Sequence, residues 1–438
     1  MGRVLPSVLA ALLATAAFAD DGAVRPVQPT LQTPYLTEAD QDADADDPAI
    51  WVHPADATNS LVITAVKNGG IRVYDLKAGL VQAIGPEPEG TRINNVDLVY
   101  GFALSDGTSA DLVVASDRGR DFIRIWKIDP ETPAAPLTEI TAPDAARAFP
   151  ARLARDGVTT EENPVDDQET VYGLAAWTDA ASGVTWVAGT QRHQTLVGLF
   201  RLEARPGGTV AAVIDHAFTV PAEHRGQSLW EESDEDPAKD WSPQFEGLVI
   251  DRTDGRLYAG QEDVGIWAIP VADAGAAPVL VYETRGAEGS PFRNEDSAIS
   301  RDVEGLTIYY AATGTRYLLA SSQGGAHGED GRPDAPYDDS FVVFDLAGDA
   351  PALLGSFRVE AHGDIDAVQE SDGADVISLG LPGFPDGLFV TQDGYAGDLN
   401  GLDGEVDSTG FKFVDWRAIA SAFEPPLEIT PAGFDPRK

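Results

Sequence analysis

Cysteine is absent from this chain of 438 residues, which excludes disulfide bonds and thiolate chemistry. Histidine is scarce: only six are present, and none stands in the HxxxH or HExxH spacing of a catalytic zinc site. The side chains that remain as metal ligands are carboxylates. Their oxygens are hard donors, which favour calcium or magnesium.

Basic residues are few as well, because 30 Lys and Arg stand against 72 Asp and Glu, for a formal net charge of −42 at pH 7. A surface with this charge excludes nucleic acid and anionic membranes as partners. Solubility or adaptation to salt explains most of the carboxylates. Only those at positions that recur along the chain are therefore candidate ligands.

A long hydrophobic run occurs only near the N-terminus. Within residues 1–19 a single basic residue, Arg3, precedes an apolar stretch and then Ala17-Phe18-Ala19, a small-x-small cleavage pattern. The stretch is too short to span a membrane and predicts a secretory signal peptide; a buried N-terminal helix is the alternative. No later stretch approaches 18 consecutive apolar residues, so we expect a soluble mature chain that is secreted or periplasmic.

Short strands joined by turns recur along the chain. Residues 245–269, FEGLVIDRTDGRLYAGQEDVGIWAI, contain three predicted strands. The strand–turn–strand pattern has six copies, at residues 61–76, 111–128, 185–202, 256–269, 317–346 and 387–416. Each copy follows a strand that opens on a polar residue: Asp46, Asn94, Tyr172, Glu246, Glu304 and Asp372. Six repeats that each form one small antiparallel sheet predict an all-β protein, a six-bladed β-propeller.

Composition predicts the boundaries of the propeller. Residues 20–41 lack periodicity and are predicted to be an extended arm that is either disordered or closes the ring. The propeller is predicted over residues 42–424, and a Pro-rich tail over residues 425–438. Three long segments rich in Pro, Gly and acidic residues are predicted to be loops on the rim rather than separate domains: 132–170, 221–243 and 324–340.

Charges of both signs are expected at one end of the ring axis. Lys67, Arg118 and Arg192 occupy or adjoin the same turn in three consecutive blades, whereas Glu262 and Asp263 fill the matching turn of the fourth. A single cation in a turn is usually a solvated charge, but three at equivalent positions converge on the channel mouth. This layout predicts an anionic ligand that is bound partly by Lys and Arg and partly through metal ions.

Several motifs resemble those of the β-propeller phytases. The most specific are DVEGLTIYYA at residues 302–311 and LLASSQG at residues 318–324; DDPAIWVHP, INNVDLVYGF, QEDVGIW and GLFVTQDG support them. The resemblance extends over about residues 42–419. It implies a secreted, calcium-dependent phosphatase, a 3-phytase, that removes phosphate from myo-inositol hexakisphosphate (phytate). It also implies a cleavage site and a neighbouring affinity site for a second phosphate.

The same resemblance implies roles for individual residues. The carboxylates that match the ligands of the catalytic calcium ions are Glu246, Glu262, Glu304 and Asp372. Other positions match further metal ligands, the last two for structural calcium: Asp46, Asp47, Asp263, Asp302 and Asp366. The channel tyrosine and the phosphate-binding cations match Tyr172, Lys67 and Arg118. The chain departs from the family where Thr190-Gln191 replace a Lys-Glu pair, and Arg192 is expected to reach that phosphate instead.

The expected mechanism has no phosphoenzyme, because no Ser, Cys or His nucleophile is suitably placed. Several calcium ions are expected to neutralise the phosphate, and a calcium-bound water or hydroxide to attack in line with the leaving inositol oxygen. Lys67, Arg118 and Arg192 would stabilise charge on the phosphoryl oxygens. We expect the substrate to be phytate as its calcium salt, and the enzyme to be a monomer. Two alternatives stay open, a non-catalytic calcium-stabilised binding module and a calcium-dependent lactonase, although a neutral substrate needs no cationic trio.

Overall fold

Short β-strands make up most of the computed structural model, which describes residues 22–149, 152–153, 159–160, 165, 168–230, 241–287, 289–324, 334–348, 350–395, 408–429 and 435–437. The predicted signal peptide lies outside these residues, as do parts of the predicted rim loops and tail. Within the described ranges, no helix is long and apolar enough to cross a membrane.

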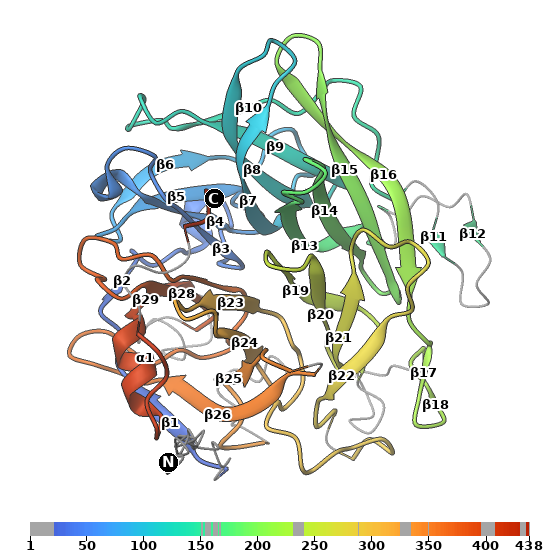
Figure 1. Cartoon of the computed structure of the whole chain (residues 1–438), viewed down its shortest axis with the longest axis vertical. Coiled ribbons are helices and arrows are strands. Elements are labelled where there is room, and N and C mark those ends of the chain that lie inside the picture. The colour runs from blue at the N-terminus through green and yellow to red at the C-terminus, as the bar shows by residue number, and fades with distance from the viewer. Residues whose placement is uncertain are drawn as a thin grey trace, which may run out of the picture.

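The described strands form six blades around a central axis, so the predicted six-bladed β-propeller is confirmed (Figure 1). Blade one contains β3 (Pro48–Trp51), β4 (Leu61–Ala65), β5 (Ile71–Asp75) and β6 (Leu80–Ile84). Blade two contains β7 (Ile93–Ala103), β8 (Ser109–Asp117), β9 (Phe122–Ile128) and β10 (Leu137–Glu139). Blade three contains β13 (Val171–Thr178), β14 (Thr185–Gln191), β15 (Leu196–Arg205) and β16 (Thr209–Thr219).

The second half of the ring repeats the pattern. Blade four contains β19 (Phe245–Asp251), β20 (Arg256–Gln261), β21 (Gly265–Pro270) and β22 (Val279–Glu283). Blade five contains β23 (Leu306–Tyr310), β24 (Arg316–Ser322), β25 (Ser340–Asp345) and β26 (Ala352–Val359). Blade six contains β27 (Ala374–Ile377), β28 (Leu388–Asp393) and β29 (Gly410–Asp415). The first strand of each blade lies next to the axis and contacts the first strand of the next blade, including β27 with β3.

The N-terminal arm adds an outer strand to each of the last two blades. Strand β1 (Val24–Val27) pairs in parallel with β26, and β2 (Leu31–Gln32) pairs antiparallel with β29. Because the arm is the first described part of the chain and these blades are the last, the pairing fastens the two ends of the ring together. Helix α1 (Trp416–Ala422) follows β29, and Asp415 is its N-cap, because the Asp415 side chain accepts a hydrogen bond from the Arg417 amide.

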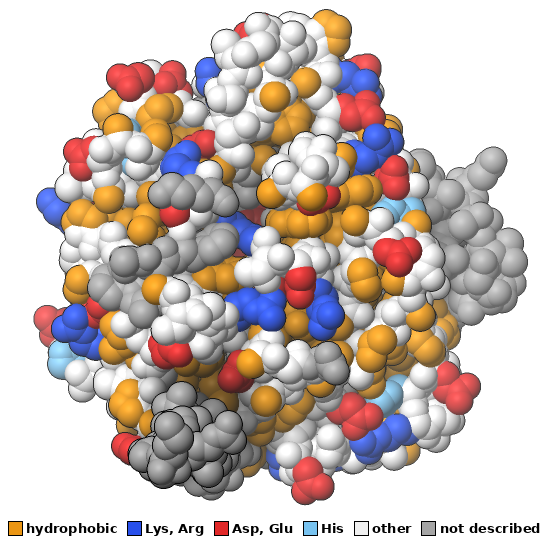
Figure 2. All heavy atoms as spheres, viewed as in Figure 1, with side chains coloured by type: hydrophobic (Ala, Val, Ile, Leu, Met, Phe, Trp, Pro, Cys, Tyr) orange, Lys and Arg blue, Asp and Glu red, His pale blue; other side chains and the backbone are white. Residues whose placement is uncertain are grey.

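Smaller elements decorate the ring. They are the 3-10 helices η1 (Glu38–Asp40) and η2 (Ala57–Asn59) and the two-stranded pairs β11 (Arg152–Leu153) with β12 (Thr159–Thr160) and β17 (Glu223–His224) with β18 (Gln227–Ser228). Figure 2 shows one face of the ring, on which several Lys and Arg side chains lie near the centre and many acidic ones near the periphery.

Apolar side chains fill the space between adjacent blades. Strand β4 (LVITA) is buried along its whole length, because both faces of its sheet are covered by neighbouring sheets. Ile63 of β4 and Val113 of β8 share one cluster between blades one and two, and Val62 of β4 and Val390 of β28 share another between blades six and one. The hydrophobic core is thus a ring of inter-blade layers, and apolar side chains also line part of the channel along the axis.

Glycine allows adjacent inner strands to approach closely at the axis. Gly173, Gly247, Gly305 and Gly373 each follow the polar residue that opens their strand. A Cβ added at Gly173 would overlap the carbonyl oxygen of Glu246, and one at Gly305 would lie 2.6 Å from that of Asp372. The missing side chain therefore lets the polar residue of the following blade come close to the axis.

We expect Gly173→Ala to destabilise the ring, because the added methyl group must displace the backbone at Glu246. The expected loss of unfolding free energy is about 1–3 kcal/mol, seen as a lower urea midpoint by circular dichroism. The matched control is Gly275→Ala, in a turn where the nearest atom to an added Cβ is Asp273 Oδ1 at 3.4 Å. Equal midpoints for the two variants would contradict this reading of the axis.

Candidate functional site

Five carboxylates lie together at one end of the ring axis. Asp46, Glu246 and Asp372 each offer an oxygen within 4.8 Å of the others, and the same is true of Glu246, Glu262 and Glu304. Glu246 belongs to both groups, so the five form one continuous cluster, called here the acidic cluster. All except Glu304 are buried. The structure thus brings together predicted ligands from blades one, four, five and six.

The repeat explains this convergence. Asp46, Glu304 and Asp372 each lie two residues before an inner strand, and Glu246 is the second residue of β19. Glu262 directly follows β20, which runs antiparallel to β19 and so ends at the same edge of blade four. Equivalent positions in a propeller blade point at the same region of the axis, so residues far apart in sequence meet there.

Neutral amides support the acidic cluster. Asn94 Nδ2 donates a hydrogen bond of 2.6 Å to Glu246 Oε1. Gln244 Nε2 lies 2.8 and 2.9 Å from the two carboxylate oxygens of Glu262. Gln323 Nε2 donates to Glu304 Oε2. These donors orient three carboxylates without neutralising their charge.

Some carboxylate oxygens of the cluster have no donor. Both oxygens of Asp46 and the Oδ1 of Asp372 are buried and have no hydrogen-bond partner among the described residues. Buried polar atoms are nearly always satisfied, so orphaned ones at a candidate site indicate an ion or a ligand. The oxygen-only donor set matches the preference of calcium, and the acidic cluster therefore fits a group of calcium ions.

Burial and mutual repulsion raise the pKa values of four of these carboxylates. Burial raises the pKa of Asp46 to about 8, with Lys67 opposing and Glu246 adding to the rise. The pKa values of Glu262, Glu304 and Asp372 also lie well above the ordinary range, first because of burial and then because of the neighbouring carboxylates. A cation bound among them would reverse this effect, since positive charge favours the ionised form.

Lys67 places one positive charge inside the cluster. Its Nζ lies 3.1 Å from Asp44 Oδ2, 3.7 Å from Asp46 Oδ2 and 3.7 Å from Asp372 Oδ2. Burial alone would lower the pKa of Lys67, but the summed attraction of the three carboxylates raises it. The lysine is therefore charged over the whole physiological pH range.

Arg118 and Arg192 flank the other side of the mouth. Their guanidinium carbons lie 5.3 and 5.6 Å from the centroid of the Tyr172 ring. Burial, followed by repulsion from Glu246 and other carboxylates, raises the pKa of Tyr172 well above its usual value, so the phenol stays neutral. Arg118 Nη1 also donates a hydrogen bond of 2.7 Å to Asn94 Oδ1. Asn94 therefore joins the cationic side of the mouth to the acidic cluster.

The two sides enclose one cavity of about 260 Å³. This volume admits several waters or ions, since one water occupies about 30 Å³ in the liquid. The cavity is lined by Asp44, Lys67, Arg118, Tyr172, Arg192, Glu246, Glu304, Gln323, Glu370, Asp372, Gln392 and Gly394. All three predicted phosphate-binding cations border it, together with the predicted tyrosine.

Four other predicted metal ligands lie around or beyond this cavity. Asp47 Oδ2 accepts a hydrogen bond of 3.0 Å from the Val96 amide. Asp263 Oδ2 accepts one of 2.7 Å from the Ser242 amide, and Arg301 Nη1 lies 3.6 Å from its Oδ1. Arg301 Nε also lies 3.8 Å from Asp302 Oδ2.

Asp366 stands apart from the acidic cluster. Its Oδ1 accepts a hydrogen bond from Lys412 Nζ, which also lies 2.7 Å from Asp393 Oδ2. Lys412 is 1% exposed and Asp393 is fully buried. Lys412 therefore supplies one positive charge between two carboxylates, Asp366 and Asp393, and a structural calcium ion there stays a prediction.

The two residues of blade three that depart from the family pattern, Thr190 and Gln191, form structural hydrogen bonds. Thr190 and Gln191 are buried; Thr190 Oγ1 donates 2.8 Å to the Phe245 carbonyl, and Gln191 Nε2 donates 2.9 Å to the Glu169 carbonyl. Neither side chain lines the cavity, whereas Arg192 does. The positive charge of blade three is therefore carried by Arg192, two residues after the position at which the family pattern has its lysine.

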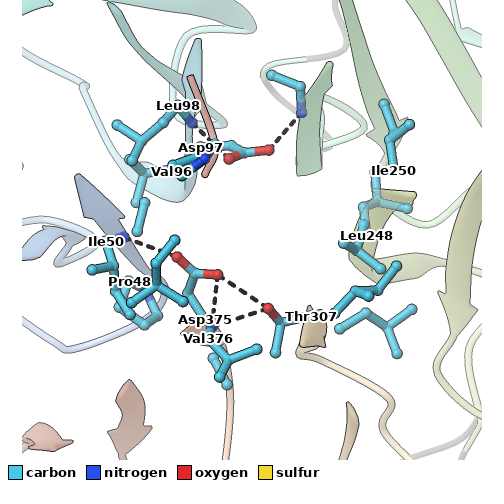
Figure 3. A pocket seen from close by; sticks show the side chains of 18 of the residues that line it. Pro48, Ile50, Val96, Asp97, Leu98, Leu248, Ile250, Thr307, Asp375 and Val376 are labelled. Carbon is cyan, nitrogen blue, oxygen red and sulfur yellow. Dashed lines mark hydrogen bonds between the residues drawn. The ribbon is translucent and has the colours of Figure 1, made fainter. Parts of the chain in front are cut away.

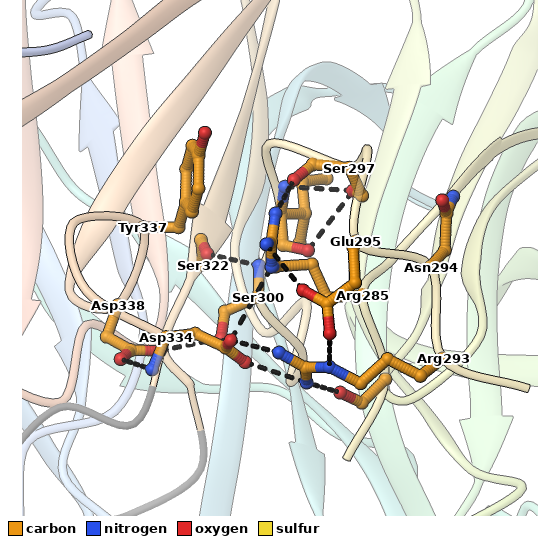
Figure 4. Close-up of polar contacts among 12 residues, drawn as sticks. Arg285, Arg293, Asn294, Glu295, Ser297, Ser300, Ser322, Asp334, Tyr337 and Asp338 are labelled. Carbon is orange, nitrogen blue, oxygen red and sulfur yellow. Dashed lines mark hydrogen bonds and ion pairs between the residues drawn. The ribbon is translucent and has the colours of Figure 1, made fainter. Parts of the chain in front are cut away.

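A polar cluster holds the segment that leads to Glu304 (Figure 4). Asp334 accepts hydrogen bonds from Arg293, and its amide donates 2.6 Å to Asp338 Oδ2. Ser300 Oγ donates 2.6 Å to Asp338 Oδ1, and the Ser300 amide donates 2.8 Å to Ser322 Oγ. These contacts tie the chain before β23 to blade five and so position Glu304 at the axis.

Polar contacts join neighbouring inner strands around the channel beyond the acidic cluster, where apolar side chains line much of the wall (Figure 3). Asp375 Oδ2 accepts a hydrogen bond of 2.8 Å from the Ile50 amide, and its Oδ1 accepts one of 3.0 Å from Thr307 Oγ1. Asp97 Oδ2 accepts one of 2.6 Å from the Ala176 amide. These contacts link blade six to blades one and five, and blade two to blade three.

Sequence reasoning missed several of these residues. Asn94 was recognised only as a strand opener, although it contacts both Glu246 and Arg118. Gln244 and Gln323 were not assigned, and they donate to predicted ligands. Asn94 lies in the motif INNVDLVYGF and Gln323 in the motif LLASSQG, so these two motifs could have indicated both residues. Gln244 lies just before the stretch at residues 245–269, and no pattern in the sequence pointed to it.

The fold and the site define a class of protein: a closed six-bladed propeller whose channel mouth combines a buried acidic cluster with three cations and a neutral tyrosine. The chain belongs to the Phytase family, whose model matches residues 3–148 and 238–438. The chain is also 30% identical over 387 residues to the 3-phytase of Bacillus subtilis (strain 168), covering 87% of this chain and 82% of that protein.

Solved structures resemble the chain more remotely. One is a protein of unknown function from Bacteroides thetaiotaomicron, with 10% identity, a TM-score of 0.42 and coverage of 89% of this chain and 74% of that one. Another is the β-propeller domain of Cps50 (Swd1) from Myceliophteria thermophila, with 10% identity, a TM-score of 0.37 and coverage of 84% and 83%.

We expect the metal-free chain to lose stability as the pH rises. The pKa of Asp46 is about 8 in the folded protein against an ordinary 3.8, so the fold keeps a proton that the unfolded chain has released. The free energy of unfolding therefore falls as the pH rises from about 4 to about 8, by at most about 1.4 kcal/mol per pH unit, because only the unfolded chain releases this proton in that range. Urea midpoints in EDTA should fall over this range, and Asp46→Asn should flatten the fall. An unchanged slope in that variant would contradict the prediction.

Proposed function

We propose that this chain is a calcium-dependent 3-phytase, secreted or periplasmic, that hydrolyses phosphate monoesters of phytate. The observation that carries the proposal is the pairing, at one channel mouth, of the acidic cluster with Lys67, Arg118 and Arg192. Membership of the Phytase family and the similarity to the B. subtilis 3-phytase support the choice of substrate. The N-terminal sequence pattern supports export.

Calcium is the metal that this donor set suits best. Calcium takes six to eight oxygen ligands, and the residues that would hold it are Asp46, Glu246, Glu262, Glu304 and Asp372. When bound, calcium ions would neutralise the phosphate oxygens and lower the pKa of a bound water molecule.

The residues of the mouth would bind and orient the phosphoryl group. Arg118 and Arg192 can donate to its oxygens from one side, and Lys67 from the acidic side. Charge on these oxygens is stabilised most effectively by groups that are already in position, because no reorganisation is then needed. Asn94 contacts both Arg118 and Glu246, so we expect it to fix the cationic side of the mouth relative to the acidic cluster.

Hydrolysis of phytate should depend on calcium. The purified mature chain is expected to release inorganic phosphate from calcium phytate at neutral pH, to lose this activity in excess EDTA and to recover it when calcium is restored. Phosphate release that persists in EDTA would contradict the metal-dependent mechanism. No release at any calcium concentration would instead favour the binding module or, if a lactone is hydrolysed, the lactonase.

Neutralising the acidic cluster should abolish turnover. Glu246→Gln and Asp372→Asn are each expected to lower kcat by at least about a hundredfold, because each removes a charged ligand from a shared site. Circular dichroism should show an intact fold in both variants. The matched control is Glu203→Gln on the outer part of blade three, where Glu203 pairs with Arg205 at 3.0 Å, and it should keep full activity. Activity retained in both cluster variants would remove this site assignment.

A further inference from the structure

The central channel has a second end, opposite the acidic cluster, called here the far mouth. The inner strands run from the acidic cluster to this end. The residues at or near the ends of five of these strands are Trp51 in blade one, Tyr100 in blade two, Trp177 in blade three, Arg252 in blade four and Tyr310 in blade five. Aromatic side chains from four blades are therefore placed at the far mouth.

The segment Asp435–Arg437 reaches this end of the channel. Pro436 lines two cavities, one of about 70 Å³ and one of about 230 Å³, and Arg437 lines the larger one. The smaller cavity belongs to the central channel, because its lining includes inner-strand residues of all six blades: Ile50, Leu98, Leu174, Ile250, Ile308 and Val376. The segment therefore forms part of the channel wall, although it lies outside the six blades.

Four groups of blades one and two contact the guanidinium group of Arg437. Its Nη1 lies 2.8 Å from Asp111 Oδ2, and its Nη2 donates a hydrogen bond to the Val52 carbonyl. Its central carbon lies 4.6 Å from the centroid of the Tyr100 ring and 5.8 Å from that of the Trp51 ring. Both distances fall within the range in which a cation is attracted to an aromatic face. These four groups are called here the guanidinium cage.

Hydrogen bonds within the blades hold the cage in position without help from Arg437. Trp51 Nε1 donates 2.8 Å to Asp111 Oδ2, and the Gly101 amide donates 2.9 Å to Asp111 Oδ1. The Tyr100 hydroxyl accepts a hydrogen bond of 3.1 Å from the Val52 amide. The side chains of Arg437 and Asp111 are only 22% and 11% exposed, so water screens their attraction less than that of a surface pair. The cage is therefore preorganised for a guanidinium group.

We propose that the guanidinium cage is a binding site for Arg437, and that the segment Asp435–Arg437 thereby closes the far mouth. The Asp435 carboxylate accepts a hydrogen bond of 3.0 Å from the Arg437 amide, which shapes the segment for this contact. Ions and substrate would then enter and leave the channel at the acidic cluster. Among the described residues, the cage shares none with the lining of the acidic-cluster cavity, so this inference does not rest on the proposed function.

Because the chain has no cysteine, one introduced thiol can report on closure. Ser378→Cys places a thiol in the wall of the same channel cavity as Pro436. Methyl methanethiosulfonate should modify this thiol at least about tenfold faster when Arg437→Gln is added, because an ion pair and two cation–π contacts that hold the segment are lost. A chain that ends at residue 434 should react at least as fast as the Arg437→Gln variant.

Two controls separate closure from general loosening of the fold. The thiol of Ser182→Cys, in an exposed turn of blade three, should react at the same rate with Arg437 or with Arg437→Gln. Arg201→Gln also removes one positive charge, but Arg201 lines neither far-mouth cavity and pairs with Asp215 at 2.8 Å, so it should not accelerate modification of Ser378→Cys. Equal rates for Ser378→Cys with and without Arg437→Gln, or an equal acceleration by Arg201→Gln, would overturn closure by this segment.

A double-mutant cycle tests the cage itself. Arg437→Gln should lower the urea midpoint of the unmodified chain, and it should lower the midpoint of the Asp111→Asn chain by less than half as much, because the carboxylate that pairs with Arg437 is already gone there. Asparagine keeps an oxygen that can accept from Trp51 Nε1, so the rest of the cage is expected to persist. Equal decreases in both chains would show that Arg437 and Asp111 do not interact and would overturn the assignment of the cage.

Discussion

Repulsion among buried carboxylates at the ring axis is the interaction on which the rest of this structure depends. Burying an ionised group that has no counter-charge or hydrogen bond destabilises the folded state. Asp46 and Asp372 nevertheless have buried oxygens that accept no hydrogen bond from the described residues. Lys67 supplies one positive charge, and neutral amides from Asn94 and Gln244 orient their partners without removing any charge. The site therefore keeps a deficit of positive charge that suits divalent cations.

The remainder of the ring resists this repulsion. Glycines such as Gly173 let inner strands pack backbone to backbone, and the arm strands β1 and β2 join the beginning of the chain to blades five and six. On the far side of the acidic cluster, Asp97 and Asp375 accept hydrogen bonds from neighbouring blades. The acidic cluster can thus stay intact because closure of the ring does not depend on the cluster itself.

The six blades could be predicted from sequence because each repeat supplies its own strands, turns and opening polar residue, as at Glu246 and Asp372. The polar residues that open the inner strands meet at the axis because the blades are arranged symmetrically around it. Contacts specific to one pair of blades do not follow from this symmetry. Asn94 meets Glu246 across 152 residues, and Lys412 lies between Asp366 and Asp393.

The ring also explains why its cations remain available to a ligand. At the six equivalent openings, blades one, four, five and six carry carboxylates, whereas blades two and three carry Asn94 and Tyr172. A carboxylate at either neutral position would pair with Arg118 or Arg192 and compete with an anionic substrate. Instead both guanidinium groups lie over the face of a phenol ring that stays protonated. A cation–π contact orients an arginine but leaves its charge free to bind an anion, so the uncharged openings of two blades are as necessary to the site as the charged openings of the other four.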